Sequence, residues 1–185
     1  MSLEKYSEVR NDFRARMIEH KKSRIIRLGS NMSLHFEDRL LMQYQVQEML
    51  RAEKIFDVTG IQEELDTYNV LIPDGMNLKA TFMIEYNDPV ERAEALKQLL
   101  GVENKIWMRI DGFDKIVPIA DEDLERSTED KTSSVHFLRF EFEKDMIDAA
   151  KQGSSIEIGV DHSFYQCSLN SLEQNHLVSL VSDFD

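Results

Sequence analysis

Hydrophobic side chains recur at every third or fourth position in three stretches near the start of the chain, and this period predicts helices. The first helix is expected from Leu3 to about Ser23, and the second from about Asp38 to Phe56. The third begins at Thr59 to Gln62, which has the spacing of a capping box, and runs to about Asn69. A helical layer therefore makes up most of the first 75 residues.

Apolar and polar residues alternate with a period of two on either side of Gly29-Ser30-Asn31. The segments Arg24 to Leu28 and Met32 to Glu37 therefore predict a hairpin with Gly29 and Asn31 in its turn. Pro73-Asp74-Gly75 predicts the turn that ends this first part of the chain.

The second half of the chain reads as one supersecondary unit used twice. In residues 76–121, apolar and polar side chains first alternate as in a strand, and apolar ones then recur at the helical period. They alternate again on both sides of a turn. Residues 135–170 repeat that order, and residues 171–185 predict a C-terminal helix. Each unit is therefore strand, helix, strand, hairpin and strand.

These patterns predict an α+β fold in one domain over residues 1–185. A mixed β-sheet is built from the two repeated units, and right-handed crossovers place their helices on one face. The helical layer of residues 1–75 and the C-terminal helix are expected to cover the other face. The acidic segment from Asp121 to Lys131, between the units, is expected to be a solvated loop.

Charge is unevenly distributed along the chain, whose formal net charge is -13. Residues 1–30 hold eight Lys or Arg against four Asp or Glu, so this segment carries +4 and the rest carries -17. A protein this acidic lacks the basic footprint that nucleic acid requires. We expect the first helix to dock on the acidic body. The alternative is an anion site formed by Arg14, Arg16, Lys21 and Arg24.

Cysteine content and hydropathy indicate the cellular compartment of the protein. A single cysteine, Cys167, excludes an internal disulfide and makes a structural thiolate zinc site improbable. No apolar run approaches the roughly 18 residues of a membrane span, and the start of the chain lacks a signal core. We expect a cytoplasmic protein with no membrane partner. A homodimer is plausible, because an exposed sheet edge or apolar helix face favours association.

Glu53 is the first candidate for chemistry, because it lies within the apolar arc that Met42, Val46, Met49 and Phe56 form on the second helix and is therefore expected to be buried. A buried carboxylate must find a cation or hydrogen-bond donor, or take up a proton. Two interpretations remain open. Glu53 is either part of a structural ion pair or, with Glu64, an acid/base pair or hard-metal ligand set.

Histidine patterns give weaker signals. His35 and Glu37 share a strand face, which supplies two of the three or four ligands that a metal needs. His162 and Cys167 invite a Cys/His nucleophile interpretation, but Cys167 falls on an apolar strand face and is expected in the core. His136 is expected to be a hydrogen-bonded core histidine. No metal site or cofactor is assigned.

Four segments of the chain resemble a bacterial family known as domain of unknown function DUF3501. They are YSEVRNDFRARMIEHKKSR, QVQEMLRAEKI, EELDTYNVLIPDG with the following LKATFMIEY, and GVDHSFY, and QVQEMLRAE is the most specific. The resemblance covers nearly the whole chain and implies an intracellular protein with no assigned reaction. It also implies an accessory part in peroxide or redox handling, since such proteins are often encoded near rubrerythrin and an iron–sulfur oxidoreductase subunit.

Ten polar positions match the family and are therefore the candidate ligand-binding residues. They are Arg14, Gln45, Glu48, Arg51, Glu53, Glu64, Tyr68, Asn69, Asp161 and His162.

The leading hypothesis is a non-catalytic accessory protein that binds a partner or a small anionic ligand where the helical layer meets the sheet. The alternative is a metal-assisted or acid/base enzyme that uses Glu53, Glu64 and a nearby histidine. Carboxylates and a histidine that converge in one pocket would favour the enzyme, whereas scattered histidines would count against it.

Overall fold

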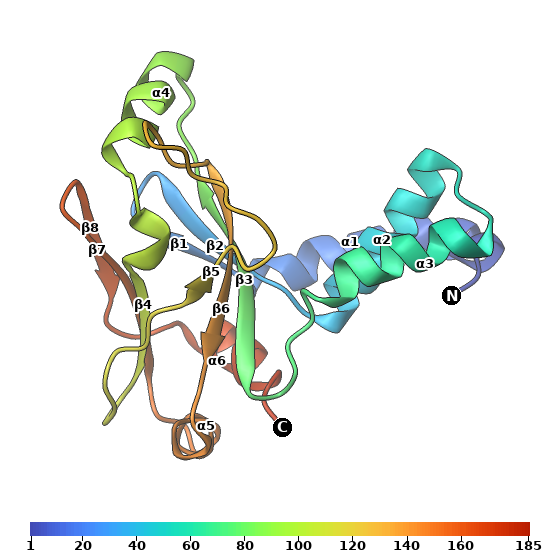
Figure 1. Ribbon diagram of the computed structural model, residues 1–185. Coiled ribbons are helices and arrows are strands. Elements are labelled where there is room, and N and C mark those ends of the chain that lie inside the picture. The colour runs from blue at the N-terminus through green and yellow to red at the C-terminus, as the bar shows by residue number, and fades with distance from the viewer.

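The computed structural model describes residues 1–185, which divide into a helical arm and a β body (Figure 1). The helical arm consists of α1 (Leu3–Lys22), α2 (Arg39–Glu53) and α3 (Val58–Asn69). It projects from one side of the body and carries the N-terminus at its far end. The body contains the strands together with α4 (Pro89–Gln98), α5 (Lys144–Lys151) and α6 (Gln174–Val181).

Local backbone signals set the ends of α2 and α3. Lys54 adopts a left-handed conformation with φ of 57° and ends α2. The Asp57 carboxylate then accepts the backbone N–H of Gly60 at 2.9 Å and caps α3. The capping box predicted at Thr59 to Gln62 is therefore wrong, because Asp57 starts the helix at Val58.

Apolar contacts hold the three helices of the arm against one another. Met17 of α1 and Leu41 and Met42 of α2 form a small buried cluster, and Phe13 and Tyr68 pack against it. No residue of α3 is fully buried. The arm is therefore held together by far less buried apolar surface than the body.

Five strands form the first antiparallel sheet, in the order β1-β2-β3-β6-β5. The hairpin predicted around Gly29 is confirmed as β1 and β2, and Gly29 takes the positive φ of 71° that its turn requires. The strands are β1 (Ile25–Leu28), β2 (Met32–Phe36), β3 (Asn77–Ile84), β5 (Ile119–Ala120) and β6 (Val135–Glu141).

A second antiparallel sheet has the order β4-β7-β8. Its strands are β4 (Ile106–Ile110), β7 (Ile156–His162) and β8 (Tyr165–Leu169), and a 3-10 turn, η1 (Val102–Asn104), precedes β4. The inner faces of the two sheets share one hydrophobic core, in which Phe82 and Phe140 of the first sheet join Met108 and Ile158 of the second. The other face of β3 and β6 is half-buried and mixed, with polar side chains such as Lys79 and Arg139 beside Phe137.

The α+β class predicted from the sequence is confirmed, but the strands lie in two antiparallel sheets rather than one mixed sheet. In each half the helix connects a strand of the first sheet to a strand of the second, so no parallel crossover forms. The last strand expected in the first unit is reduced to a single bridge between Met108 and Ile116. The internal repeat stays a prediction.

The helical layer also differs from expectation, because it projects from the body instead of lying flat on a sheet (Figure 1). At the base of the arm α1 meets the start of α2, where His20 Nε2 lies 2.5 Å from Oδ2 of Asp38, the N-cap of α2. No helix of the structure combines the length and apolar composition needed to cross a membrane.

Candidate functional site

A cavity of about 400 Å³, here called the ligand cavity, lies where the end of α3 meets the polar face of the first sheet. Its walls come from α3, from β3 and β6, and from the segment that follows β5. The volume is within the range of small-molecule sites. The lining residues are Glu37, Thr67, Tyr68, Val70, Leu71, Lys79, Ala80, Glu122, Asp123, Arg126, Phe137, Leu138 and Arg139.

Glu37 and Lys79 are cross-strand neighbours on the floor of this cavity. The backbone N–H of Glu37 donates to the carbonyl oxygen of Lys79 at 2.8 Å. Burial raises the pKa of Glu37, although the hydroxyl of Thr81 donates to its Oε1 at 2.8 Å and opposes the shift. Burial also lowers the pKa of Lys79. Both shifts follow from the cost of placing charge in a partly desolvated site.

The two arginines of the ligand cavity are already neutralised by carboxylates. Arg139 donates to both oxygens of Glu122 at 2.7 Å. Arg126 donates to both oxygens of Asp123 at 2.5 and 2.6 Å, and its guanidinium lies 4.5 Å from the centre of the Phe137 ring.

Lys79 differs from these arginines because it makes no ion pair. Its Nζ donates instead to the carbonyl oxygen of Val70, at the end of α3, at 2.7 Å. An ammonium has three donors, so two remain for a ligand. Lys79 is thus the cation of the ligand cavity that has no carboxylate within ion-pair distance, although Asp74 and Glu122 act on it from further away.

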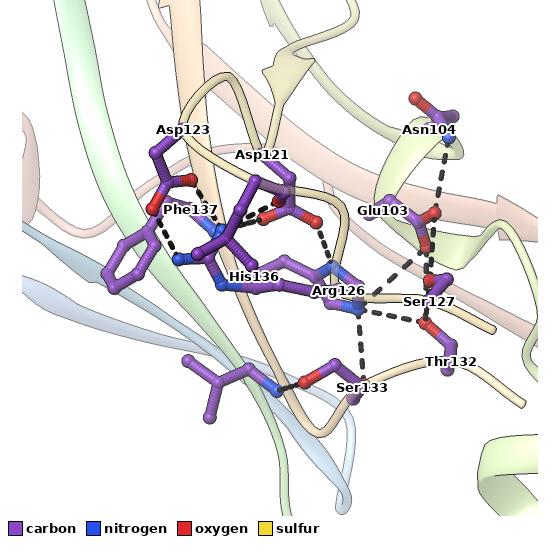
Figure 2. Close-up of polar contacts among 12 residues, drawn as sticks. Glu103, Asn104, Asp121, Asp123, Arg126, Ser127, Thr132, Ser133, His136 and Phe137 are labelled. Atoms are coloured by element: carbon purple, nitrogen blue, oxygen red, sulfur yellow. Dashed lines mark hydrogen bonds and ion pairs between the residues drawn. The ribbon is translucent and has the colours of Figure 1, made fainter.

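A buried polar network lies behind the ligand cavity (Figure 2). His136 is fully buried, and its Nδ1 lies 2.6 Å from Asp121 Oδ2. Its Nε2 lies 2.8 Å from the hydroxyl of Thr132, which donates to Glu103 Oε2 at 3.3 Å. Arg126 connects this network to the cavity, because it also donates to Asp121 at 3.2 Å.

Glu103, Asp121 and Arg126 also border a second hollow of about 210 Å³. The segment Asp121 to Lys131 is a largely exposed loop, as predicted, but it is also tied to β6 and η1, because Asp121 accepts the backbone N–H of Phe137 and Ser127 donates to Glu103. His136 is the hydrogen-bonded core histidine that the sequence predicts, and its burial keeps it away from solvent.

The prediction that Glu53 is buried is wrong, because Glu53 is exposed. α2 ends at this residue, and Phe56, which was expected to continue its apolar arc, is 71% exposed. The buried face of α2 instead includes Met42, Val46 and Leu50.

Glu48, another of the candidate ligand-binding residues, is a half-buried carboxylate within the helical arm. Arg10 donates to both of its oxygens at 2.7 Å, and the hydroxyl of Tyr6 donates to Oε1. The Arg10 hydrogen bonds lower the pKa of Glu48 to about 2, and burial raises the pKa of Tyr6. Arg51 is only a distant partner of Glu48, at 3.9 Å.

The remaining predicted residues do not come together. Arg14 and Asn69 are exposed, Gln45 is half-buried, and a buried oxygen of Glu64 has no hydrogen-bond partner. Tyr68 is the member of the predicted set that lines the ligand cavity. The anion site proposed with Arg14 also fails, because Arg24 is 1% exposed and its donors are occupied by its own chain.

Asp161 and His162 lie in the β7–β8 hairpin, on the side of the body away from the arm in Figure 1. Asp161 is exposed and pairs with Lys115 at 2.7 Å. His162 is buried, with its Nε2 3.1 Å from the carbonyl oxygen of Leu100. The geometry gives both residues local structural roles.

No group of three or more His, Cys, Asp or Glu side chains is placed to hold a metal ion. His35 and Glu37 do share a sheet face, as predicted, but His35 lies beside the hydroxyl of Ser33 at 3.0 Å. Cys167 is half-buried and packs against the core.

Sequence reasoning missed Lys79, Arg126 and Arg139 as cavity residues. A signal was present for Lys79 and Arg139, since both occupy polar positions in otherwise alternating strands. Strand pairing alone places them side by side, in register, and the sequence does not specify that pairing.

The chain was compared with known proteins. It is similar, with 46% identity and a TM-score of 0.93, to the crystal structure of a novel protein of unknown function from Burkholderia pseudomallei K96243. The match covers 100% of this chain and 96% of that one. A comparison with curated proteins gave no match. The family model described as protein of unknown function (DUF3501) matches residues 1–184, so the chain belongs to that family.

Proposed function

We propose that this protein binds a small anionic organic molecule in the ligand cavity, where the helical arm meets the first sheet. The observation that carries the proposal is the state of Lys79, a partly buried cation that has no carboxylate partner and retains free donors. An anionic group of the ligand would supply the missing charge, since buried cations are stabilised by pairing.

The walls of the cavity define the rest of the ligand. Tyr68 and Leu71 offer apolar and aromatic surface on the α3 side, and Phe137 offers it on the sheet face that carries Lys79 and Arg139. Lys79 keeps two donors, so it can serve a second acceptor on the ligand as well as the anionic group. The site therefore suits a molecule that has one anionic group, an apolar portion and a second hydrogen-bond acceptor.

An accessory, non-catalytic role fits this site better than the enzyme that was the alternative. That enzyme required Glu53, Glu64 and a histidine near one another, and Glu53 is exposed at the end of α2. A cytoplasmic role in peroxide or redox handling, with rubrerythrin or an iron–sulfur oxidoreductase as partner, is the broader proposal. It rests on the family association alone.

Isothermal titration tests the binding proposal with benzoate and phenyl phosphate as anionic probes and benzylamine as a cationic control. We expect the anionic probes to bind and benzylamine not to bind. Replacing Lys79 by Met removes a charge-assisted hydrogen bond, so the affinity should fall on the order of 10- to 100-fold.

The matched control is Lys151→Met, which removes an exposed lysine at the end of α5. It should bind the probes as the wild type does, and Lys79→Arg, which keeps the charge, should retain most of the affinity. Absence of anion binding to the wild type at millimolar concentration would sink the proposal, as would equal affinity of the Lys79→Met and wild-type proteins.

A further inference from the structure

His136 is a buried histidine whose two ring nitrogens both face oxygen atoms of the protein (Figure 2). Its Nδ1 lies 2.6 Å from Oδ2 of Asp121. Its Nε2 lies 2.8 Å from the hydroxyl oxygen of Thr132 and 3.1 Å from the carbonyl oxygen of Ser133. Because the side chain is 0% exposed, these neighbours decide where the ring protons lie.

The neighbours of Nε2 require a proton on that nitrogen. A backbone carbonyl oxygen only accepts hydrogen bonds, so the contact with Ser133 needs an N–H on Nε2. The Thr132 hydroxyl agrees with this, because it donates its single proton to Oε2 of Glu103 at 3.3 Å. The oxygen of Thr132 is then free to accept from Nε2.

The neighbour of Nδ1 is an acceptor as well. Oδ1 of Asp121 accepts the backbone N–H of Phe137 at 3.0 Å and an N–H of Arg126 at 3.2 Å. Both donors favour the ionised carboxylate, which has no proton to give. The hydrogen bond between Asp121 and His136 is therefore donated by Nδ1. These contacts together require a proton on each ring nitrogen.

The charges around the ring also balance when it is an imidazolium. Asp121 and Glu103 are the carboxylates that face it, with side chains only 10% and 11% exposed, and Glu103 Oε2 lies 3.9 Å from Nε2. Arg126 is the cation beside them, and it is shared with an exposed carboxylate of its own segment. Phe82 of β3 stacks on His136 and brings no charge. A protonated ring supplies the second cation that two buried carboxylates need.

We propose that His136 is a pH switch that fixes the segment Asp121 to Lys131 and, through it, one wall of the ligand cavity. The imidazolium donates to Asp121 at the start of the segment and to Thr132 just after its end, so both ends are held. A neutral ring can donate to only one of them. If Nδ1 keeps the proton, the Thr132 hydroxyl must turn to Nε2 and leave Glu103.

Two residues of the segment carry this change to the ligand cavity. Arg126 and Asp123 both line the cavity, and Arg126 donates to Asp121 as well as to Asp123. A wall that is held at one end only is less ordered and should bind a ligand less well. The inference rests on the proposed anion binding in this cavity, whereas the protonation of His136 is a property of the protein without ligand.

NMR of the full chain with ¹⁵N in the histidine rings tests the protonation without any ligand. The ring of His136 is identified by its contact with Phe82, so the measurement needs no variant. At pH 7 we expect two N–H groups on this ring, with the ¹⁵N shifts of an imidazolium. A neutral ring with one N–H at pH 7 would overturn the proposal, whatever the cavity binds.

Raising the pH tests the switch itself. Trypsin cleavage of the wild type after Arg126 and Lys131 should accelerate over the pH interval in which NMR reports loss of the His136 proton. His136→Gln has no ring to titrate, so its cleavage should show only the pH dependence of trypsin. The matched control is His162→Gln, which removes a buried histidine of the β7–β8 hairpin and should keep the wild-type profile.

Binding is followed by isothermal titration with benzoate over the same pH range. Burial lowers the pKa of Lys79, so loss of its proton also weakens binding as the pH rises. His136→Gln retains Lys79 and supplies this baseline. Beyond it, the wild-type affinity should fall by about fivefold or more, the lower end of measured couplings between two sites.

The outcomes separate the switch from the binding proposal. Cleavage that follows the His136 proton in a protein that binds no benzoate would support the switch and contradict the proposed function. Parallel profiles of the wild type and a folded His136→Gln protein, in cleavage and in affinity, would overturn the switch. Circular dichroism over the pH range establishes that each protein is folded.

Discussion

Tyr6, Arg10 and Glu48 form a closed hydrogen-bonded set within the helical arm. Both oxygens of Glu48 are occupied by Arg10, and Tyr6 donates to one of them. Glu48 lines neither the ligand cavity nor the hollow beside it. The set therefore has the character of a structural ion pair that joins α1 to α2, which is one of the two roles that the sequence left open for Glu53.

The low pKa of Glu48 makes the stability of the protein depend on pH. Its pKa is about 2 in the folded protein and 4.5 as the unperturbed value, so the unfolded chain binds the proton more readily. The stabilisation is present above pH 5 and is lost as pH falls toward 2. Replacing Glu48 by Gln should lower the free energy of unfolding by about 2 kcal/mol at pH 7 and by much less at pH 3.

Urea denaturation of the Glu48→Gln and wild-type proteins at both pH values measures this difference. Glu53→Gln is the control, because Glu53 is exposed and makes no ion pair, and it should have little effect at either pH. A Glu48→Gln effect of equal size at pH 7 and pH 3 would contradict the ion-pair account.

Among the elements of the fold, the segment Asp121 to Lys131 depends most on buried polar contacts. Asp121 adopts a positive φ of 51°, and its carboxylate accepts the backbone N–H of Phe137 at 3.0 Å while facing the ring of His136. Thr132 and Glu103 hold the other end of the segment. Because His136 lies between these two attachments, it fixes the conformation of the whole segment.

Replacing His136 by Phe should release this segment. The ring fits beside Phe82, on which His136 stacks, but Asp121 Oδ2 would lose its partner. Asp121 Oδ1 would keep Phe137 and Arg126, and Thr132 would keep Glu103. Loss of the His136 contacts costs about 1 to 3 kcal/mol. Trypsin cleavage after Arg126 and Lys131 should become faster, whereas His162→Phe, which alters a different hairpin, should leave cleavage at these sites unchanged. Equal protection of the His136→Phe and wild-type proteins would contradict this role.

Local patterns in the sequence predicted the elements well, because the helical period and strand alternation follow from which side chains must be buried. The β1–β2 hairpin and the helices of the arm are found where the patterns indicated. Glu53 shows the limit of this reasoning. A helical wheel assumes that the helix continues, but the left-handed Lys54 ends α2 and leaves Glu53 in an exposed last turn.

The ligand cavity could be predicted only as a location, the junction of helices and sheet. Its floor depends on β2 lying beside β3, which brings Glu37 next to Lys79, and on β3 lying beside β6. These pairings join residues far apart in the chain and reflect packing of the whole core. Tyr68 was the cavity residue that a family pattern could indicate.

At the scale of the whole molecule, the helical arm and the β body meet at a small junction centred on Arg24. This side chain is 1% exposed and bonds to the end of β2, to the carbonyl oxygen of Ser179 at 3.1 Å, and to Asp183 beyond α6. The body has a large shared core, whereas the main cluster of the arm is small. The arm should therefore open at a lower free energy than the body.

Hydrogen exchange measured by mass spectrometry tests this division. In the wild type, the amides of α3 should exchange faster than those of β3 and β7. Replacing Arg24 by Met breaks a buried ion pair, which costs about 3 to 5 kcal/mol, because Asp183 is left without its cation. Exchange should then accelerate in α1 and α2, at the base of the arm, more than in β7.

Adding Asp183→Asn to Arg24→Met should recover part of the lost stability, because burial already raises the pKa of Asp183 and the amide carries no charge to desolvate. The recovered part of the free energy of unfolding measures the cost of leaving Asp183 without its cation. The part that is not recovered measures the lost packing of the long Arg24 side chain. Uniform acceleration of exchange in the arm and the body would show instead that the two parts unfold as one unit, and that Arg24 stabilises the whole core rather than the junction.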